Sequence, residues 1–226
     1  MPTLAARCRR FYAENMFVEG TLRWQVTEDC PWDLLMALSL RDLGGLNTLS
    51  SPRIPLVNPP AQLVRRAAGG VVISRPPVTS PVEREALQLQ WTQWWNTIVR
   101  RELRPLITGL RPPHFAEFDR QLELQDLIIQ HYDAAVAWTA ARHDEYAQTS
   151  VEQHAIRASD IVDVVRDREH ELRRQAGYFR LDIAVLPLAE PGAWIVGPNA
   201  VVVSQSLRDD SASFREWFRP FVEALV

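Results

Sequence analysis

The chain has 226 residues, of which 46% are hydrophobic and 23% charged, and its formal net charge is −3. These values are ordinary for a globular protein that can bury a substantial core. No stretch reaches the roughly 18 uncharged apolar residues that a membrane-spanning helix needs, and the acidic balance argues against general nucleic-acid binding. We expect one α+β domain over residues 1–226, divisible into 1–110 and 111–226, and neither a membrane nor a nucleic acid as its partner.

All 25 basic residues are arginine, because the sequence contains no lysine. Arginine codons are GC-rich, so a bacterial source with a GC-rich genome is expected. Without lysine this chain cannot supply a phosphate-loop lysine, a Schiff base or a Ser–Lys dyad. The HExxH, paired CxxC and GxSxG motifs are absent as well.

Two cysteines, Cys8 and Cys30, are too few for a disulfide framework and fit reduced thiols. The first residues carry Arg7, Arg9 and Arg10 without an apolar segment, which argues against a signal peptide. These features predict a cytoplasmic protein.

The first 60 residues predict a helix, a strand, a second helix and a loop. Residues 3–16 have apolar side chains at helical spacing, and residues 21–27 alternate between apolar and polar side chains, as in a half-buried strand. A buried helix follows from Pro31 to the glycine pair that begins at Gly44. Residues 47–60 are rich in proline and serine and predict a connecting loop that could also face a partner.

Three tryptophans lie within five residues of the next predicted helix. A short strand is expected at residues 71–73, and Ser80 followed by proline then marks a helix start. Trp91, Trp94 and Trp95 recur at helical spacing on this helix. Such a stripe usually faces the core, but it could also form a pocket that binds a ring-bearing small molecule.

Residues 121–177 predict the central feature of the fold, a long helical hairpin. Apolar side chains recur at three- and four-residue steps, and Ser150, with Gln153 three residues later, predicts a new helix start after a break near residues 148–150. Gly177 is expected to end the second helix.

The second helix of this hairpin carries a row of acidic residues. Asp160, Asp163, Asp167 and His170 fall in one narrow arc at 100° per residue. A solvated face neutralised by nearby arginines is one interpretation. The other is a divalent metal held by Asp163, Asp167 and His170, with Asp160 or His154 as general base on bound water.

After Gly177 the pattern changes to a period of two, which predicts strands. Residues 179–185 and 194–204 are expected to pair as antiparallel neighbours, the second run being interrupted at residues 197–199. A last helix follows, capped by Asp210, Ser211 or Ser213 and bent or split at Pro220. The predicted fold is α+β: a small, mostly antiparallel sheet packed by helices, with the long central helical hairpin at residues 121–177.

Three functions are compatible with these patterns. The first is a cytoplasmic binding protein without catalytic activity that interacts with a protein partner or with its own copies, because catalytic motifs are absent and tryptophan is abundant. The second is a metal-dependent hydrolase that uses the Asp/His row. The third is a small-molecule binder with a tryptophan-lined pocket.

Overall fold

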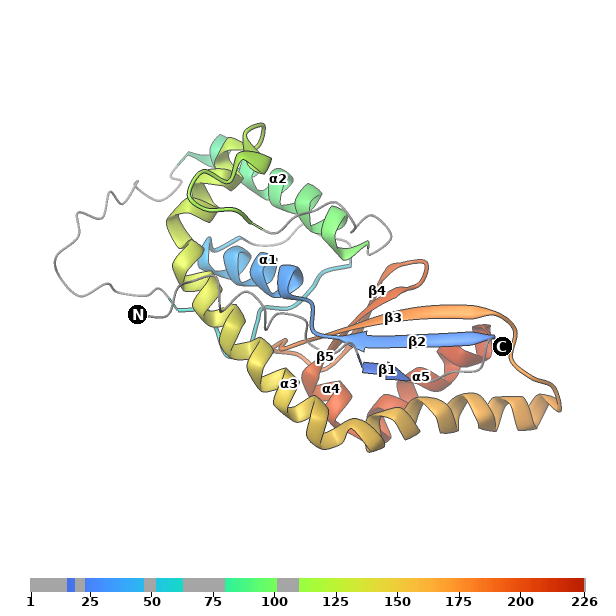
Figure 1. Ribbon diagram of the computed structural model, residues 1–226. Coiled ribbons are helices and arrows are strands. Elements are labelled where there is room, and N and C mark those ends of the chain that lie inside the picture. Colours follow the sequence, from blue (N-terminus) through green and yellow to red (C-terminus); the bar gives the residue numbers. More distant parts are fainter. Residues whose placement is uncertain (1–15, 19–22, 47–51, 63–79, 101–109, 226) are drawn as a thin grey trace.

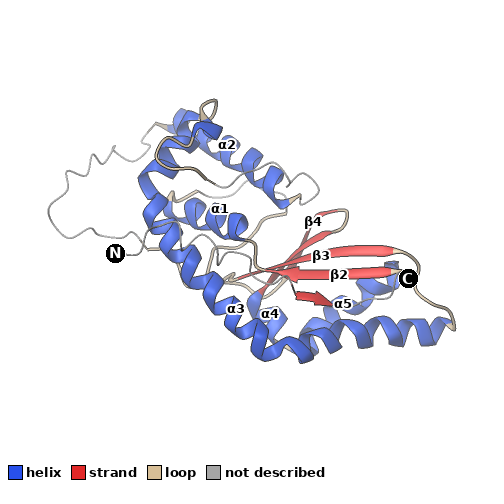
Figure 2. Ribbon diagram, in the orientation of Figure 1, coloured by secondary structure: helices blue, strands red, loops and turns tan. Residues whose placement is uncertain are grey.

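The computed structural model describes residues 16–18, 23–46, 52–62, 80–100 and 110–225. The fold is α+β, as the sequence predicts. Figure 2 shows α3, α4 and α5 along one side of the sheet, and α1 and α2 as a layer of helices beyond one end of it. The elements in chain order are β1 (Met16–Val18), β2 (Trp24–Asp29), α1 (Trp32–Leu43), α2 (Pro81–Val99), the 3-10 helix η4 (Ala116–Phe118), α3 (Leu122–Leu172), β3 (Phe179–Leu186), β4 (Ala193–Gly197), β5 (Ala200–Ser204), α4 (Gln205–Asp209) and α5 (Ser211–Leu225).

The sheet is mixed, so the prediction of a mostly antiparallel sheet is wrong. Its strand order is β1-β2-β3-β5-β4. The central strand β3 is parallel to both of its neighbours, β2 and β5, and only the outer pairs β1–β2 and β4–β5 are antiparallel. Seven of the eight residues of β3 are buried, as is typical of a parallel strand covered on both faces.

A tight turn within the predicted second strand explains the error. The chain reverses at residues 198–199, so that β4 and β5 form a hairpin rather than one interrupted strand. β4 brings the chain back along the sheet, and β5 then inserts between β4 and β3. The expected antiparallel pairing of residues 179–185 with 194–204 is therefore replaced by parallel pairing of β3 with β5.

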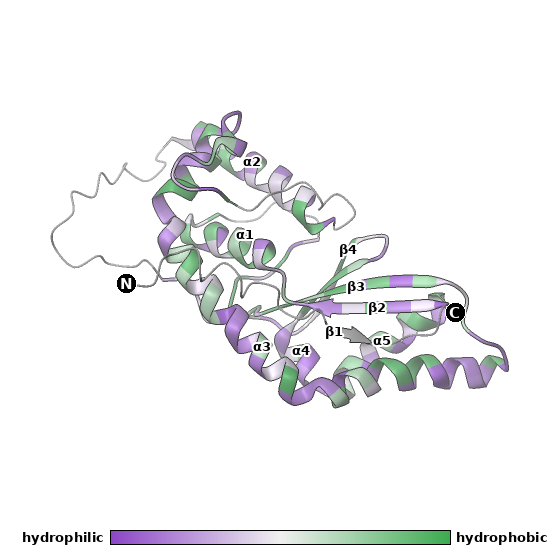
Figure 3. Cartoon of the chain, in the orientation of Figure 1, coloured by the Kyte–Doolittle hydropathy of each residue, from purple (hydrophilic) through white to green (hydrophobic). Residues whose placement is uncertain are grey.

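The predicted helical hairpin is also wrong, because α3 is a single helix of 51 residues. Ser150 lies inside it and caps nothing. Figure 1 shows that the helix axis bends near its middle, and Figure 3 shows hydrophilic and hydrophobic stretches alternating along its length. The helix ends at Leu172, short of Gly177: Arg173 adopts the left-handed conformation with φ 50°.

The bend lets the two halves of α3 cover different parts of the molecule. The first half packs on α1, where a Cβ atom on Gly44 would lie 2.7 Å from Leu127 Cδ1. The second half runs beside α5 under the sheet (Figure 1), where Asp163 accepts a hydrogen bond from Arg215. The buried apolar side chains of the two parts form one connected core.

The remaining predictions fare differently. The helices expected after Pro31 and after Ser80 are confirmed as α1 and α2. The last helix is confirmed as α5, with Asp210 accepting hydrogen bonds from the backbone N–H groups at its start; Pro220 lies inside it without splitting it. The strand expected at residues 71–73 lies outside the described residues, as does the helix expected at residues 3–16 apart from its last residue.

Candidate functional site

A buried carboxylate, Glu28, lies at the centre of a group of buried, paired charges. It occupies an inward position of β2, two residues after Val26 and four after Trp24, so the alternation of the strand directs its side chain toward the helices. Its side chain is completely buried. A buried carboxylate is costly unless it is paired and hydrogen-bonded.

Two buried arginines from different helices provide that pairing. Arg157 of α3 donates from Nη1 to Glu28 Oε1 at 3.1 Å, and Arg208 of α4 donates from Nε to Glu28 Oε2 at 2.7 Å. Arg208 Nη2 also donates to the backbone oxygen of Arg157 at 2.8 Å. Its guanidinium lies 4.0 Å from the centre of the Phe214 ring, a cation–π contact that desolvation strengthens.

Asp160 extends the cluster toward α5. Its Oδ2 accepts from Arg208 Nη1 at 3.2 Å, and its Oδ1 accepts from Arg215 Nε at 2.7 Å and from the Ser211 hydroxyl. Arg215 reaches on to Asp163 Oδ2 at 3.0 Å. We call Glu28, Arg157, Asp160, Arg208 and Arg215 the Glu28 cluster.

The Glu28 cluster fastens four elements to one another. The fully buried members are two carboxylates and two guanidinium groups, so their formal charges cancel. Each buried carboxylate oxygen accepts at least one hydrogen bond from an arginine. Such a network stabilises a unique arrangement of β2, α3, α4 and α5. Its charged groups bind one another, which is the arrangement of a structural network.

Two ionisable groups beside the cluster are held in their neutral forms. Burial raises the pKa of the Cys30 thiol far above its usual value, although Arg157 opposes the shift. Burial likewise raises the pKa of the Tyr146 phenol, and the charge of Glu28 adds to this effect. A thiol that stays protonated is a poor nucleophile, so Cys30 acts as a buried apolar residue.

The residues of the predicted Asp/His site all lie on α3, but they differ in burial and in their partners. Asp160 is buried and Asp163 is half-buried, and arginines from the C-terminal helices bind both. Asp167 and His170 lie further along α3 and are exposed, as is His154. Within the described ranges, no group of three or more His, Cys, Asp or Glu side chains is arranged to hold a metal ion.

The three tryptophans of the predicted pocket lie in the core. Trp91 stacks on Trp95 with ring centres 5.5 Å apart, and its Nε1 donates to the Ala37 oxygen at 2.9 Å. Trp94 meets the ring of Phe118 edge-on at 5.5 Å. They fill the contact between α2 and its neighbours α1 and η4.

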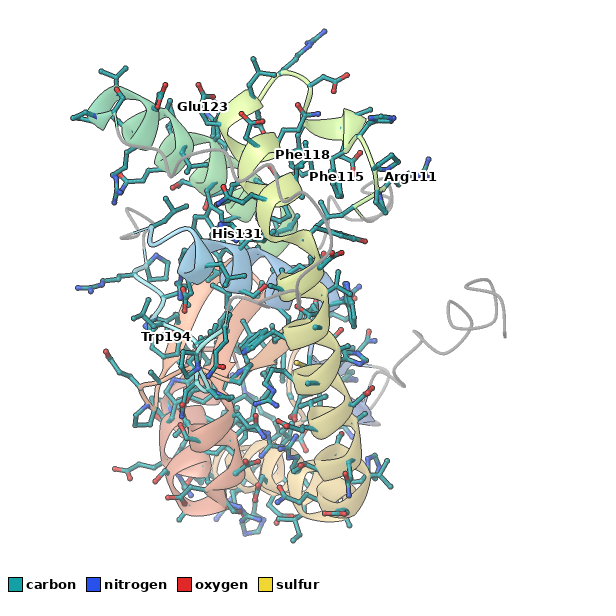
Figure 4. All side chains as sticks on the ribbon, turned by 90° about the vertical axis from the view of Figure 1, so that its left-hand side faces the viewer. Arg111, Phe115, Phe118, Glu123, His131 and Trp194 are labelled. Carbon is teal, nitrogen blue, oxygen red and sulfur yellow. The ribbon has the colours of Figure 1, made fainter. Side chains whose placement is uncertain are left out.

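Two histidines of α3 are buried in the helical layer. His131 is labelled in Figure 4, between α3 and α1, with Phe115, Phe118 and Glu123 above it. Burial lowers the pKa of His131 and of His143, and the nearby charge of Asp144 opposes part of the shift at His143. Both imidazoles are therefore neutral at pH 7, and His143 packs edge-on against Trp32.

Sequence reasoning missed Glu28, Arg157 and Arg208. One signal was available. In the alternating pattern of the strand, Glu28 points to the same buried face as Trp24 and Val26, and a charged residue at such a position requires a buried partner. The identity of that partner was not encoded locally, because Arg157 and Arg208 lie 129 and 180 residues away along the chain.

Comparison with protein-family models, with curated proteins and with solved structures finds no match to this chain. Among the helices that the structure describes, none has the length and apolar character needed to cross a membrane.

Proposed function

We propose that this chain is a cytoplasmic protein-binding module without catalytic activity, and that it binds by adding a strand of its partner to the edge strand β4. The observation that carries the proposal is the uncharged, apolar composition of that edge, at which the Ile195 side chain is exposed. The pairing of the titratable groups in the Glu28 cluster with one another supports a structural rather than a catalytic use of these charges.

Among the described residues, β4 lies at the end of the sheet and has β5 as its one strand neighbour. Its Ile195 side chain is 61% exposed, while Trp194 and Val196 are half-buried. No charged residue occurs from residue 191 to residue 207. Natural edge strands are usually protected from pairing by charged residues, proline or a covering element. Within β4 itself neither charge nor proline is present, which is expected of an edge that is meant to pair.

The backbone of β4 presents regular hydrogen-bonding groups to a partner. The Ser204 N–H donates to the Gly192 oxygen at 2.9 Å, so the backbone groups of Gly192 point toward β5. Because these directions alternate along an antiparallel strand, Trp194 also points toward β5, whereas Ala193 and Ile195 point outward. The register shifts only after Ile195, so the outward groups of these two residues lie in the regular part of the strand.

Position-specific photocrosslinking tests the proposal. A photoreactive phenylalanine derivative replaces Ile195 in the full-length protein expressed in cells, and the control carries it at Val151, an exposed apolar position of α3. We expect a discrete adduct from position 195, formed with a segment in extended conformation, and none of comparable yield from position 151. Equal labelling from both positions would contradict the proposal, as would no adduct from position 195.

A further inference from the structure

We infer that the partner strand is β4 of a second copy of this chain, paired antiparallel about a two-fold axis at Ile195. The inference rests on the proposed function and names its partner. In this arrangement the five-stranded sheet continues without a break into the sheet of the partner subunit, in the order β3-β5-β4 followed by β4-β5-β3.

The hydrogen-bonding groups of β4 are complementary to themselves. A two-fold axis at Ile195 places its outward N–H and C=O opposite the same groups of Ile195 of the partner subunit. Each copy then donates one hydrogen bond and accepts one, as in the narrow pairs of an antiparallel ladder. Isologous pairing of this kind is the commonest way in which identical chains associate.

The side chains are also compatible with self-pairing. In the register set by Ile195, the two Ile195 side chains lie next to each other on one face of the joined sheet, and the Trp194 side chains lie on the other face. The exposed Ile195 side chain would thereby be withdrawn from water.

Charge distinguishes a second copy from a charged partner. The chain has a net charge of −3, so two copies repel weakly at a distance, but the edge at which they would meet is uncharged. An identical strand therefore meets it without like-charge contact, whereas a basic or acidic segment would find no charge of opposite sign on β4. The uncharged edge of β4 therefore favours an apolar strand without charged residues as its partner, and β4 itself has that composition.

Sedimentation equilibrium of the purified full chain tests the inference. The mass should rise from 25.9 kDa toward twice that value as the concentration increases from the micromolar to the millimolar range. Ile195→Asp should abolish the rise because the two-fold axis places two carboxylates together. Val151→Asp, a matched change at a position that is 75% exposed, should leave it intact.

A charge-swap experiment tests the register. Ile195→Asp and Ile195→Arg should each be monomeric, and an equimolar mixture should dimerise, because only residue 195 faces itself across the axis. A mixture that stays monomeric while the wild type dimerises would overturn the register. A wild-type chain that remains monomeric up to millimolar concentration would overturn self-pairing. In that case a crosslink from position 195 to a different protein would still support the proposed function, and its absence would remove both.

Discussion

Replacing Glu28 by alanine should lower the free energy of unfolding by about 3–5 kcal/mol, the usual cost of breaking a buried ion pair. Arg157 and Arg208 would both remain buried and would lose the carboxylate that they share. Urea unfolding at pH 7, followed by tryptophan fluorescence and circular dichroism, measures this loss.

Two further variants separate loss of pairing from loss of packing. Asp209→Asn removes a partner of Arg157 whose side chain is 35% exposed, and should cost less than about 1 kcal/mol because solvent screens such pairs. The triple variant Glu28→Leu, Arg157→Met, Arg208→Met should recover most of the stability that Glu28→Ala loses, since apolar residues can replace a buried ion cluster. A loss of under about 1 kcal/mol for Glu28→Ala would show that the cluster does not fasten the fold.

Replacing Trp91 by alanine should cost about 3–5 kcal/mol, because it removes a fully buried aromatic side chain and leaves a cavity. The change also removes the stacking contact with Trp95 and the hydrogen bond from Trp91 Nε1 to the Ala37 oxygen. Thermal and urea unfolding measure the effect. Leu89→Ala on the same helix is the control: its side chain is 59% exposed, and the change should stay within about 0.5 kcal/mol. A comparably small effect at Trp91 would contradict its place in the core.

The sequence patterns were most informative where local signals determined structure. Ser80 and Pro81 located the start of α2, and the period-two run before Pro187 located β3. The prediction of a helix break at Ser150 was wrong because α3 continues through it, although the helix axis does bend near its middle (Figure 1). A capping motif inside a long helix does not end it when burial of the apolar face on both sides of the motif stabilises the helix more than the capping hydrogen bonds would stabilise a break.

Strand pairing could not be read from local patterns. Parallel and antiparallel neighbours of β3 require the same alternation of side chains, and the choice depends on where β2 and β5 arrive in space. The same limit applied to the acidic row on α3. The spacing of Asp160 and Asp163 places both on one arc of the helix, but their partners Arg208 and Arg215 come from the C-terminal helices and not from α3.

Amide hydrogen exchange at two adjacent residues of β4 tests the proposed edge pairing most directly. Trp194 has its N–H directed toward β5, and Ile195 has its N–H directed outward. Self-pairing predicts that the Trp194 amide exchanges slowly at every protein concentration, whereas the Ile195 amide is protected at high concentration and exchanges rapidly on dilution. Rapid exchange of Ile195 at all concentrations, with Trp194 protected throughout, would show that the outer edge of β4 stays unpaired and would contradict the account.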